Sequence, residues 1–260
     1  MKKLISLAAA VFILTSSFFC EGAFLPDEPS QSAVEKNLAT FPENGIPVLM
    51  YHSISSKYDS SICVSEKLFR KQADWLYSNN YHTVTPDWLL AAMAGRRSLP
   101  ENPILITFDD GFHDNYSVAW PILKEYGFNA TFFIVTDQVN PYNIDWDQLI
   151  ELVSQGNSIG SHTVHHYDLS ALSCTQQESE LSQSRRILEE KLGTDIKSFS
   201  FPYGKYNETT LSLLPELGYA LSFTTTSGKV RLGDDEYLLK RVHIEGGMPM
   251  KEFVKQVSYP

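Results

Sequence analysis

The sequence predicts an α/β protein whose parallel strands alternate with helices and close into a (β/α) barrel of seven or eight units. From residue 46 onward, short apolar runs alternate with longer amphipathic stretches, which is the pattern of βαβ units. The apolar runs contain few polar residues, which indicates strands covered by helices on both faces. This number of units favours a closed barrel, and an open doubly wound sheet is the second choice.

Eight short runs are the expected strands. The first, IPVLMYH at 46–52, reads as a buried strand, and PILITF at 103–108 has too few polar residues for a solvated face. The remaining runs lie at 81–85, 130–135, 157–162, 197–202, 219–225 and 237–244.

The stretches between these runs have helical periodicity. Residues 65–80 place Phe69, Ala73 and Leu76 on one stripe, which predicts a helix packed inward. Residues 86–95 open with a proline and close with a glycine, as helices commonly do.

The longest expected helix covers 175–193. It begins with a capping box formed by Thr175 and Glu178 and ends at Gly193. Further helices are expected at 121–127, 145–156, 207–218 and 250–258.

Composition bounds the function. The 260 residues are 43% hydrophobic and 20% charged, which are globular values. The net charge of -10, without a basic stripe, argues against a nucleic-acid partner. No Gly-x-Gly-x-x-Gly follows the first strand, so a dinucleotide site has no support.

The N-terminus predicts export. Residues 1–23 have two lysines, an apolar core too short to span a bilayer and then small and polar residues, the pattern of a signal peptide. Residues 24–45 are expected to be a linker or N-terminal arm, and 46–260 the barrel domain.

Cys20 offers a lipidation alternative to the signal peptide, although the preceding Phe19 is bulky for such a site. An uncleaved anchor is the other alternative, so membrane attachment is expected through the N-terminus alone. The expected location is periplasmic, cell-envelope or secreted.

Two further cysteines, Cys63 and Cys174, are far apart in the sequence and belong to no Cys-x-x-Cys motif. They are expected to be separate thiols rather than a disulfide or metal ligands.

Histidines and aspartates recur where the expected strands end. The segments read MYHS, TFDDG, GSHTVHH, FPYG and RVHIEGG. In a parallel barrel the working groups lie at the C-terminal strand ends. Adjacent Asp109 and Asp110 point to opposite faces of their strand, so they can have different roles. An Asp-Gly turn with a helix cap is the structural alternative.

His162 and His166 are four residues apart, a spacing at which two imidazoles on a helix turn, or on a loop with the same curl, can bind one ion. With one aspartate they make three ligands and leave positions open for water and substrate, as in catalytic metal sites. The spacing also leaves His165 as an alternative to His166. The structural alternative is that these histidines are ordinary surface or core residues that bind no metal.

The segments PVLMYHSI, TFDDG, SHTVHH and FPYGKYN together resemble the polysaccharide deacetylase family (NodB homology, carbohydrate esterase family 4) over about residues 46–258. The resemblance implies a distorted (β/α) barrel. It also implies metal-dependent hydrolysis that removes acetyl groups, first of all N-acetyl groups, from an acetylated cell-envelope or extracellular glycan. Zn²⁺ is the first expectation for the metal, and Co²⁺, Mn²⁺ or Ni²⁺ are compatible with these ligand types.

The resemblance also assigns roles to residues. It makes Asp109 the general base, Asp110 a metal ligand and His162 and His166 the paired histidine ligands. Tyr203 matches the position whose backbone N–H helps to hold the oxyanion, and His243 the late histidine that protonates the leaving amine, although the usual Leu-x-His motif reads RVHI here.

One position departs from the family pattern: Ser200 stands where many members have an arginine that pairs with the catalytic aspartate. Arg241 lies on the same strand face as His243, and the hypothesis is that Arg241 supplies the missing charge at the substrate and oxyanion region.

Three other functions stay open. The departure at Ser200 leaves a non-catalytic glycan-binding protein as one alternative, and an O-acetyl esterase acting on acetylated xylan as another. A glycosidase is the third, although two carboxylates beside two histidines suit a metal better.

Further side chains near the strand ends are weaker candidates. His52 ends the first strand and either faces the site or is a core histidine. Aromatic residues that could stack on sugars, although such residues are more often core, are Trp88, Trp120, Trp146 and Tyr142.

Overall fold

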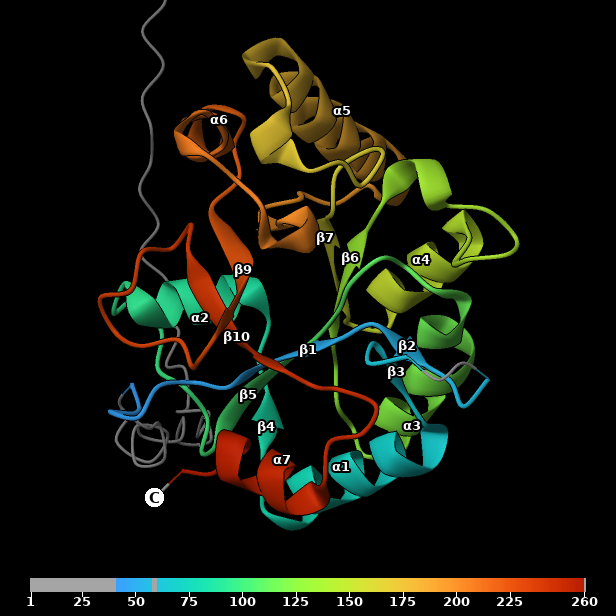
Figure 1. Ribbon diagram of the computed structural model, residues 1–260. Coiled ribbons are helices and arrows are strands. Elements are labelled where there is room, and N and C mark those ends of the chain that lie inside the picture. Colours follow the sequence, from blue (N-terminus) through green and yellow to red (C-terminus); the bar gives the residue numbers. More distant parts are fainter. Residues whose placement is uncertain (1–40, 58–59, 260) are drawn as a thin grey trace, which may run out of the picture. The chain divides into compact units, whose positions relative to one another are not determined.

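The computed structural model describes residues 41–57 and 60–259 (Figure 1). The expected signal peptide at 1–23, the lipidation alternative at Cys20 and most of the expected linker lie outside the described residues. Of that linker, residues 41–45 form a turn closed by a hydrogen bond from Gly45 N to Pro42 O of 2.9 Å. In the described part of the chain, no helix has both the length and the apolar character needed to cross a bilayer.

Parallel strands form a closed barrel, as the alternation of the sequence predicts (Figure 1). Among the described residues seven strands make the ring, in the order β1-β10-β9-β8-β7-β6-β5, and β5 pairs back onto β1. The eighth strand, β4, pairs with the first two residues of β5. The bounds are β1 Val48–Tyr51, β4 His82–Thr83, β5 Pro103–Phe108, β6 Thr131–Ile134, β7 Ser158–Ser161, β8 Ser198–Ser200, β9 Leu221–Ser227 and β10 Leu239–His243.

Helices follow most strands and surround the ring (Figure 1). Their bounds are α1 Glu66–Ser78, α2 Pro86–Met93, α3 Trp120–Glu125, α4 Trp146–Ser154, α5 Cys174–Leu192, α6 Glu208–Glu216 and α7 Met250–Val257. Each predicted helix is present. A π-helical segment, η3 (Asn115–Ala119), leads into α3. Two short strands that the sequence pattern missed, β2 (Ser53–Ile54) and β3 (Cys63–Val64), pair with each other.

The predicted start of α5 is wrong. The capping box is formed by Ser173 and Gln176 rather than by Thr175 and Glu178. Ser173 is in extended backbone conformation and its hydroxyl accepts from the N–H of Gln176, so it satisfies an otherwise unpaired donor of the first turn. Gly193 ends the helix in the left-handed conformation, as expected.

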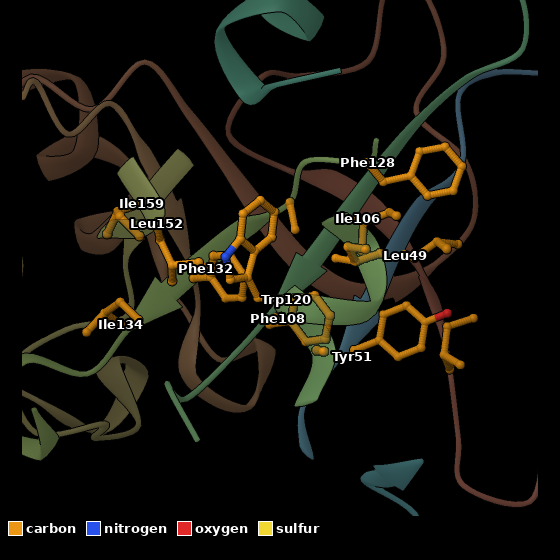
Figure 2. Close-up of a cluster of buried hydrophobic side chains, with 14 of the residues drawn as sticks. Leu49, Tyr51, Ile106, Phe108, Trp120, Phe128, Phe132, Ile134, Leu152 and Ile159 are labelled. Carbon is orange, nitrogen blue, oxygen red and sulfur yellow. The ribbon is translucent and has the colours of Figure 1, made fainter. Parts of the chain in front are cut away.

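The core has two layers because strand side chains alternate between two faces. Val48, Leu105 and Phe133 come from three different strands and belong to one cluster, which fills the inside of the ring. Neighbouring residues such as Phe108 and Phe132 face outward and pack against the helices (Figure 2). Their rings stack with centroids 5.2 Å apart. Burial on both faces explains why β1, β5 and β6 are almost entirely apolar, with Thr107 and Thr131 as the polar residues.

Candidate functional site

The polar strand ends gather at one rim of the barrel. Asp109 and Asp110 follow β5, and His162 follows β7. Ser200 is the last residue of β8, and His243 is the last of β10. Because all strands of the ring are parallel, their C-terminal ends meet at the same end of the barrel.

Asp109 and Arg241 form an ion pair inside the barrel. Arg241 donates from Nη1 to Asp109 Oδ1 at 2.8 Å and from Nη2 to Oδ2 at 2.7 Å. The Ser200 hydroxyl lies between them: it donates to Asp109 Oδ2 at 3.2 Å and accepts from Arg241 Nη2 at 2.9 Å. Arg241 is fully buried, and Asp109 is 2% exposed. The guanidinium therefore lies beneath the carboxylate in the barrel interior, rather than at the exposed rim where the substrate and oxyanion region was expected.

Burial works against ionisation of Asp109, but the Arg241 guanidinium overcomes it and holds the pKa of this carboxyl below its usual range. The remaining donors of Arg241 are also satisfied. Nε donates to the carbonyl of Thr224 at 3.0 Å and Nη1 to the hydroxyl of Thr107 at 3.2 Å. A buried charge without such partners would be strongly destabilising. With them, Asp109 stays a carboxylate although it is buried.

Asp110, His162 and His166 converge on one point. The Nε2 atoms of the two histidines are 3.2 Å apart. Asp110 Oδ1 lies 3.4 Å from His162 Nε2 and 3.2 Å from His166 Nε2. These three residues can each offer a ligand atom within 4.8 Å of the others. The structure thus brings the three predicted ligands together, with Asp109 turned away toward Arg241.

The donor set fits a divalent cation. The Nδ1 of His162 lies 2.7 Å from the carbonyl oxygen of Ser200, and a carbonyl can only accept, so Nδ1 carries a proton and, in the neutral ring, Nε2 has the lone pair that a cation needs. Two imidazoles and one carboxylate are typical ligands of Zn²⁺ and similar ions. Burial opposes the charge on Asp110, yet the two histidines keep its pKa below the usual range. Burial also lowers the pKa of His162, but Asp110 and Asp109 outweigh this effect and raise it.

The loop from His162 to His166 has an unusual backbone. Thr163 and His166 have positive φ values of 70° and 61°, and Asp110 has 74°. Such conformations are uncommon for residues with a side chain and cluster at functional sites. The Thr163 hydroxyl accepts from the N–H of His166 at 2.9 Å. This turn, rather than a helix, brings His166 back to His162.

His165 points away from the centre. Its Nδ1 lies 2.6 Å from Oε1 of Glu180, and its ring stacks on Tyr167. The spacing of the sequence left His165 and His166 as alternatives, and the structure places His166 in the cluster. Sequence reasoning missed Glu180. No apolar periodicity marks this position, because the stripe that α5 buries here holds the polar Gln177 and Ser184 beside Leu181.

Tyr203 and His243 lie at neighbouring parts of the rim. The Tyr203 ring packs edge-on against His166 with centroids 4.5 Å apart, and its φ of 56° marks a tight turn. His243 Nε2 contacts the carbonyl oxygen of Thr225. Thr225 packs so close to Gly204, the neighbour of Tyr203, that a Cβ there would lie 2.0 Å from its hydroxyl oxygen. Thr225 therefore links the His243 end of the rim to the Tyr203 turn.

The weaker candidates from the sequence lie in different environments. Burial lowers the pKa of half-buried His52 and outweighs the charges of Asp109 and Asp110, which act to raise it. Trp120 is a core residue, 6% exposed. Trp88 and Trp146 are partly buried, whereas Tyr142 is 91% exposed. Both described cysteines, Cys63 and Cys174, are free, as expected.

The fold and the site define the class of this protein. It is a closed parallel barrel with a candidate metal centre, formed by an aspartate and two histidines, at its C-terminal rim. Residues 96–222 match the family model described as polysaccharide deacetylase. The Bacillus subtilis protein YxkH, named as a polysaccharide deacetylase, is 36% identical over 209 residues, which cover 80% of this chain and 74% of that protein. The chain belongs to the polysaccharide deacetylase family.

Other relatives are named poly-β-1,6-N-acetyl-D-glucosamine N-deacetylase. One from Staphylococcus aureus is 26% identical, with 94% of this chain and 92% of the relative covered. One from Escherichia coli is 24% identical, and the chain spans 44% of its length.

Solved structures share the barrel. The Streptococcus pyogenes deacetylase PplD in complex with acetate has a TM-score of 0.79 at 29% identity, with 83% of this chain and 99% of that chain covered. IcaB from Ammonifex degensii has a TM-score of 0.75 at 28% identity, with 84% and 99% covered.

Proposed function

We propose that this protein is a metal-dependent hydrolase that removes N-acetyl groups from a polysaccharide of the cell envelope or the extracellular space. The observation that carries the proposal is the division of labour between two adjacent aspartates: Asp110 faces two histidines, whereas Asp109 is held by Arg241. The Staphylococcus aureus relative, 92% of which the alignment covers, is named for N-deacetylation of poly-β-1,6-N-acetyl-D-glucosamine and supports an N-acetylated glycan as the substrate. Export fits such a substrate and is proposed from the N-terminal sequence.

Asp110, His162 and His166 would hold the cation, first of all Zn²⁺. When bound, a cation of this kind supplies Lewis acidity toward a carbonyl oxygen and lowers the pKa of a water molecule. The chain itself supplies the fixed tautomer of His162 through the Ser200 carbonyl. It also supplies the tight turn that presents His166.

Asp109 is the general base of the proposed reaction. Arg241 keeps it ionised at neutral pH, so it can accept a proton from the attacking water. Ser200 and Arg241 hold both carboxylate oxygens from behind. Because this support is fully buried, the carboxylate does not need to reorganise when the proton arrives.

Two rim residues complete the chemistry. The backbone N–H of Tyr203 would stabilise the oxyanion, and His243 would protonate the leaving amine. The Thr225 carbonyl accepts from Nε2 of His243. Nδ1 is then the ring nitrogen left to carry the proton for the leaving group.

Two adjoining cavities support a polymeric substrate. One of about 680 Å³ lies beside β10 and α7 and is lined by His243, Glu245 and Gly247, among other residues. A second of about 420 Å³ is lined by five serines and shares Glu245 and Gly247 with the first. Hydroxyl and carboxylate linings suit the hydrogen bonds of sugars, so this surface could accept further units of a glycan chain.

Acetate release from a panel of acetylated glycans, with and without a chelator, tests the proposal. N-acetylglucosamine polymers should release acetate, and chelation should abolish the release until Zn²⁺ is added back. Release from acetylated xylan alone would indicate an O-acetyl esterase. New reducing ends without acetate would indicate a glycosidase. Glycan binding without release, unaffected by Asp109→Asn, would indicate a binding protein.

A further inference from the structure

A buried carboxylate outside the metal cluster contacts the loop that carries His166. Glu180 lies on α5 and is 6% exposed. Its Oε2 accepts from the backbone N–H groups of Val164 and His165, each at 2.9 Å. Its Oε1 accepts from Nδ1 of His165 at 2.6 Å. One side chain thus satisfies three donors within the five-residue stretch that joins the two histidine ligands.

These contacts explain how a carboxylate can be buried here. An isolated charge is costly to remove from water, but hydrogen bonds to an ionised acceptor are strong. On another side of the loop, the backbone N–H groups of Thr136 and Asp137 donate to the carbonyls of Thr163 and Val164, at 3.2 and 3.0 Å. The loop is therefore clamped between the segment after β6 and helix α5.

The clamp matters because the turn is not one that the loop would adopt by itself. Thr163 and His166 are both in the left-handed region, which residues with a side chain avoid unless the surroundings impose it. Between them, Val164 and His165 are the residues whose N–H groups Glu180 fixes. Release of these two groups would let the turn relax and carry the His166 ring away from His162 and Asp110.

The geometry points to Glu180 as a positioning residue of the metal centre: it holds His166 in place for cation binding without touching the cation. This inference rests on the proposed metal-dependent function. Partners that orient a metal ligand from behind typically contribute a factor of about 10–100 in metal affinity.

The test compares Glu180→Ala with Glu178→Ala, an exposed glutamate on the same helix. The dissociation constant for Zn²⁺ is measured at 20 °C by competition with a chromogenic chelator, and amide hydrogen exchange is measured on the metal-free proteins. Glu180→Ala should bind Zn²⁺ about 10–100-fold more weakly and exchange faster at 164–166. Glu178→Ala should match the wild type in both measurements.

Two milder variants serve if Glu180→Ala does not fold. Glu180→Gln keeps one oxygen for the two backbone donors, so its affinity should lie close to that of the wild type. His165→Ala removes one of the three contacts and should weaken binding by an intermediate factor.

Unchanged Zn²⁺ affinity and exchange in a folded Glu180→Ala protein would overturn the inference, even if its melting temperature fell. Failure of the wild type itself to bind Zn²⁺ would instead overturn the proposed metal centre. The exchange of residues 164–166 in the metal-free proteins would then still report whether Glu180 orders the loop.

Discussion

Arg241 donates two parallel hydrogen bonds to Asp109 across 132 residues of sequence. The pair forms because both residues lie on strand faces that point into the barrel. Asp109 continues the face of Leu105 and Thr107, and Arg241 continues the face of Leu239, and the two leucines belong to the inner core cluster. The small Ser200 leaves the space that the guanidinium occupies.

Replacing Arg241 by alanine should impair both catalysis and stability. Removal of one partner from a buried ion pair costs about 3–5 kcal/mol of unfolding free energy, which thermal or urea unfolding would measure. The pKa of Asp109 is low because of the guanidinium, so it should rise in the variant. A base with a higher pKa is ionised only at higher pH, and the acidic limb of the kcat/KM profile should therefore move to higher pH.

A second substitution separates charge from folding. Ser200→Arg in the Arg241→Ala background returns the cation to the position that many family members use, and the space vacated by Arg241 accommodates it. Part of the lost kcat should return, and the acidic limb should move back to lower pH. An Arg241→Ala enzyme with wild-type kcat and pH profile would show that the ion pair does not tune the base.

The adjacent aspartates should fail in different ways when each is changed to asparagine. Asp109→Asn removes the proposed base but no ligand, so kcat should fall by about 10²–10⁴ with little change in Zn²⁺ affinity. Asp110→Asn removes a ligand from the cluster, so the Zn²⁺ dissociation constant should increase strongly. Calorimetric titration with Zn²⁺, alongside acetate release, distinguishes the two. Equal loss of Zn²⁺ binding in both variants would contradict the separation of roles.

His243→Gln should slow amide hydrolysis more than ester hydrolysis. Glutamine can still donate to the Thr225 carbonyl that His243 contacts, but it cannot deliver a proton to a leaving amine. For an N-acetylated sugar the expected fall in kcat is about 10²–10⁴, whereas an aryl acetate has a leaving group that needs no proton. The two substrates are compared in one preparation, and an equal fall for both would argue against a proton-donor role.

Much of the fold could be predicted from the sequence because its signals are local. Alternation of apolar runs with amphipathic stretches identified the strands of the ring and the helices around it. The errors are also local. The two-residue strands β2 and β3 are too short for any periodicity to reveal, and Ser173 competed with Thr175 as the cap of α5.

The site was predictable only as far as strand ends determine it. Parallel topology brings Asp110 and His162 to one rim, but the choice between His165 and His166 depends on backbone torsions at Thr163 and His166. Spacing does not specify those torsions. Glu180 carries a charge that sequence reasoning assigns to a solvated helix face, and its burial depends on partners that meet it through tertiary structure.

Gly247→Trp should discriminate between polymeric and small substrates. Gly247 lines both cavities, the first of which His243 also lines, and a Cβ there would meet no heavy atom within 4 Å, so a side chain can start at this position without displacing a neighbour. The kcat/KM for long N-acetylglucosamine oligomers should fall at least about tenfold, the effect of losing roughly 1.4 kcal/mol of binding. A small aryl acetate should be hydrolysed at nearly the wild-type rate.

Glu178→Trp on α5 controls for the added indole, because Glu178 does not line either cavity. Gly246 offers the opposite case, since its Cβ would lie 2.1 Å from the Cys63 carbonyl oxygen, and a side chain there should destabilise the protein. Equal activity of wild type and Gly247→Trp on long oligomers would place the glycan chain elsewhere on the rim.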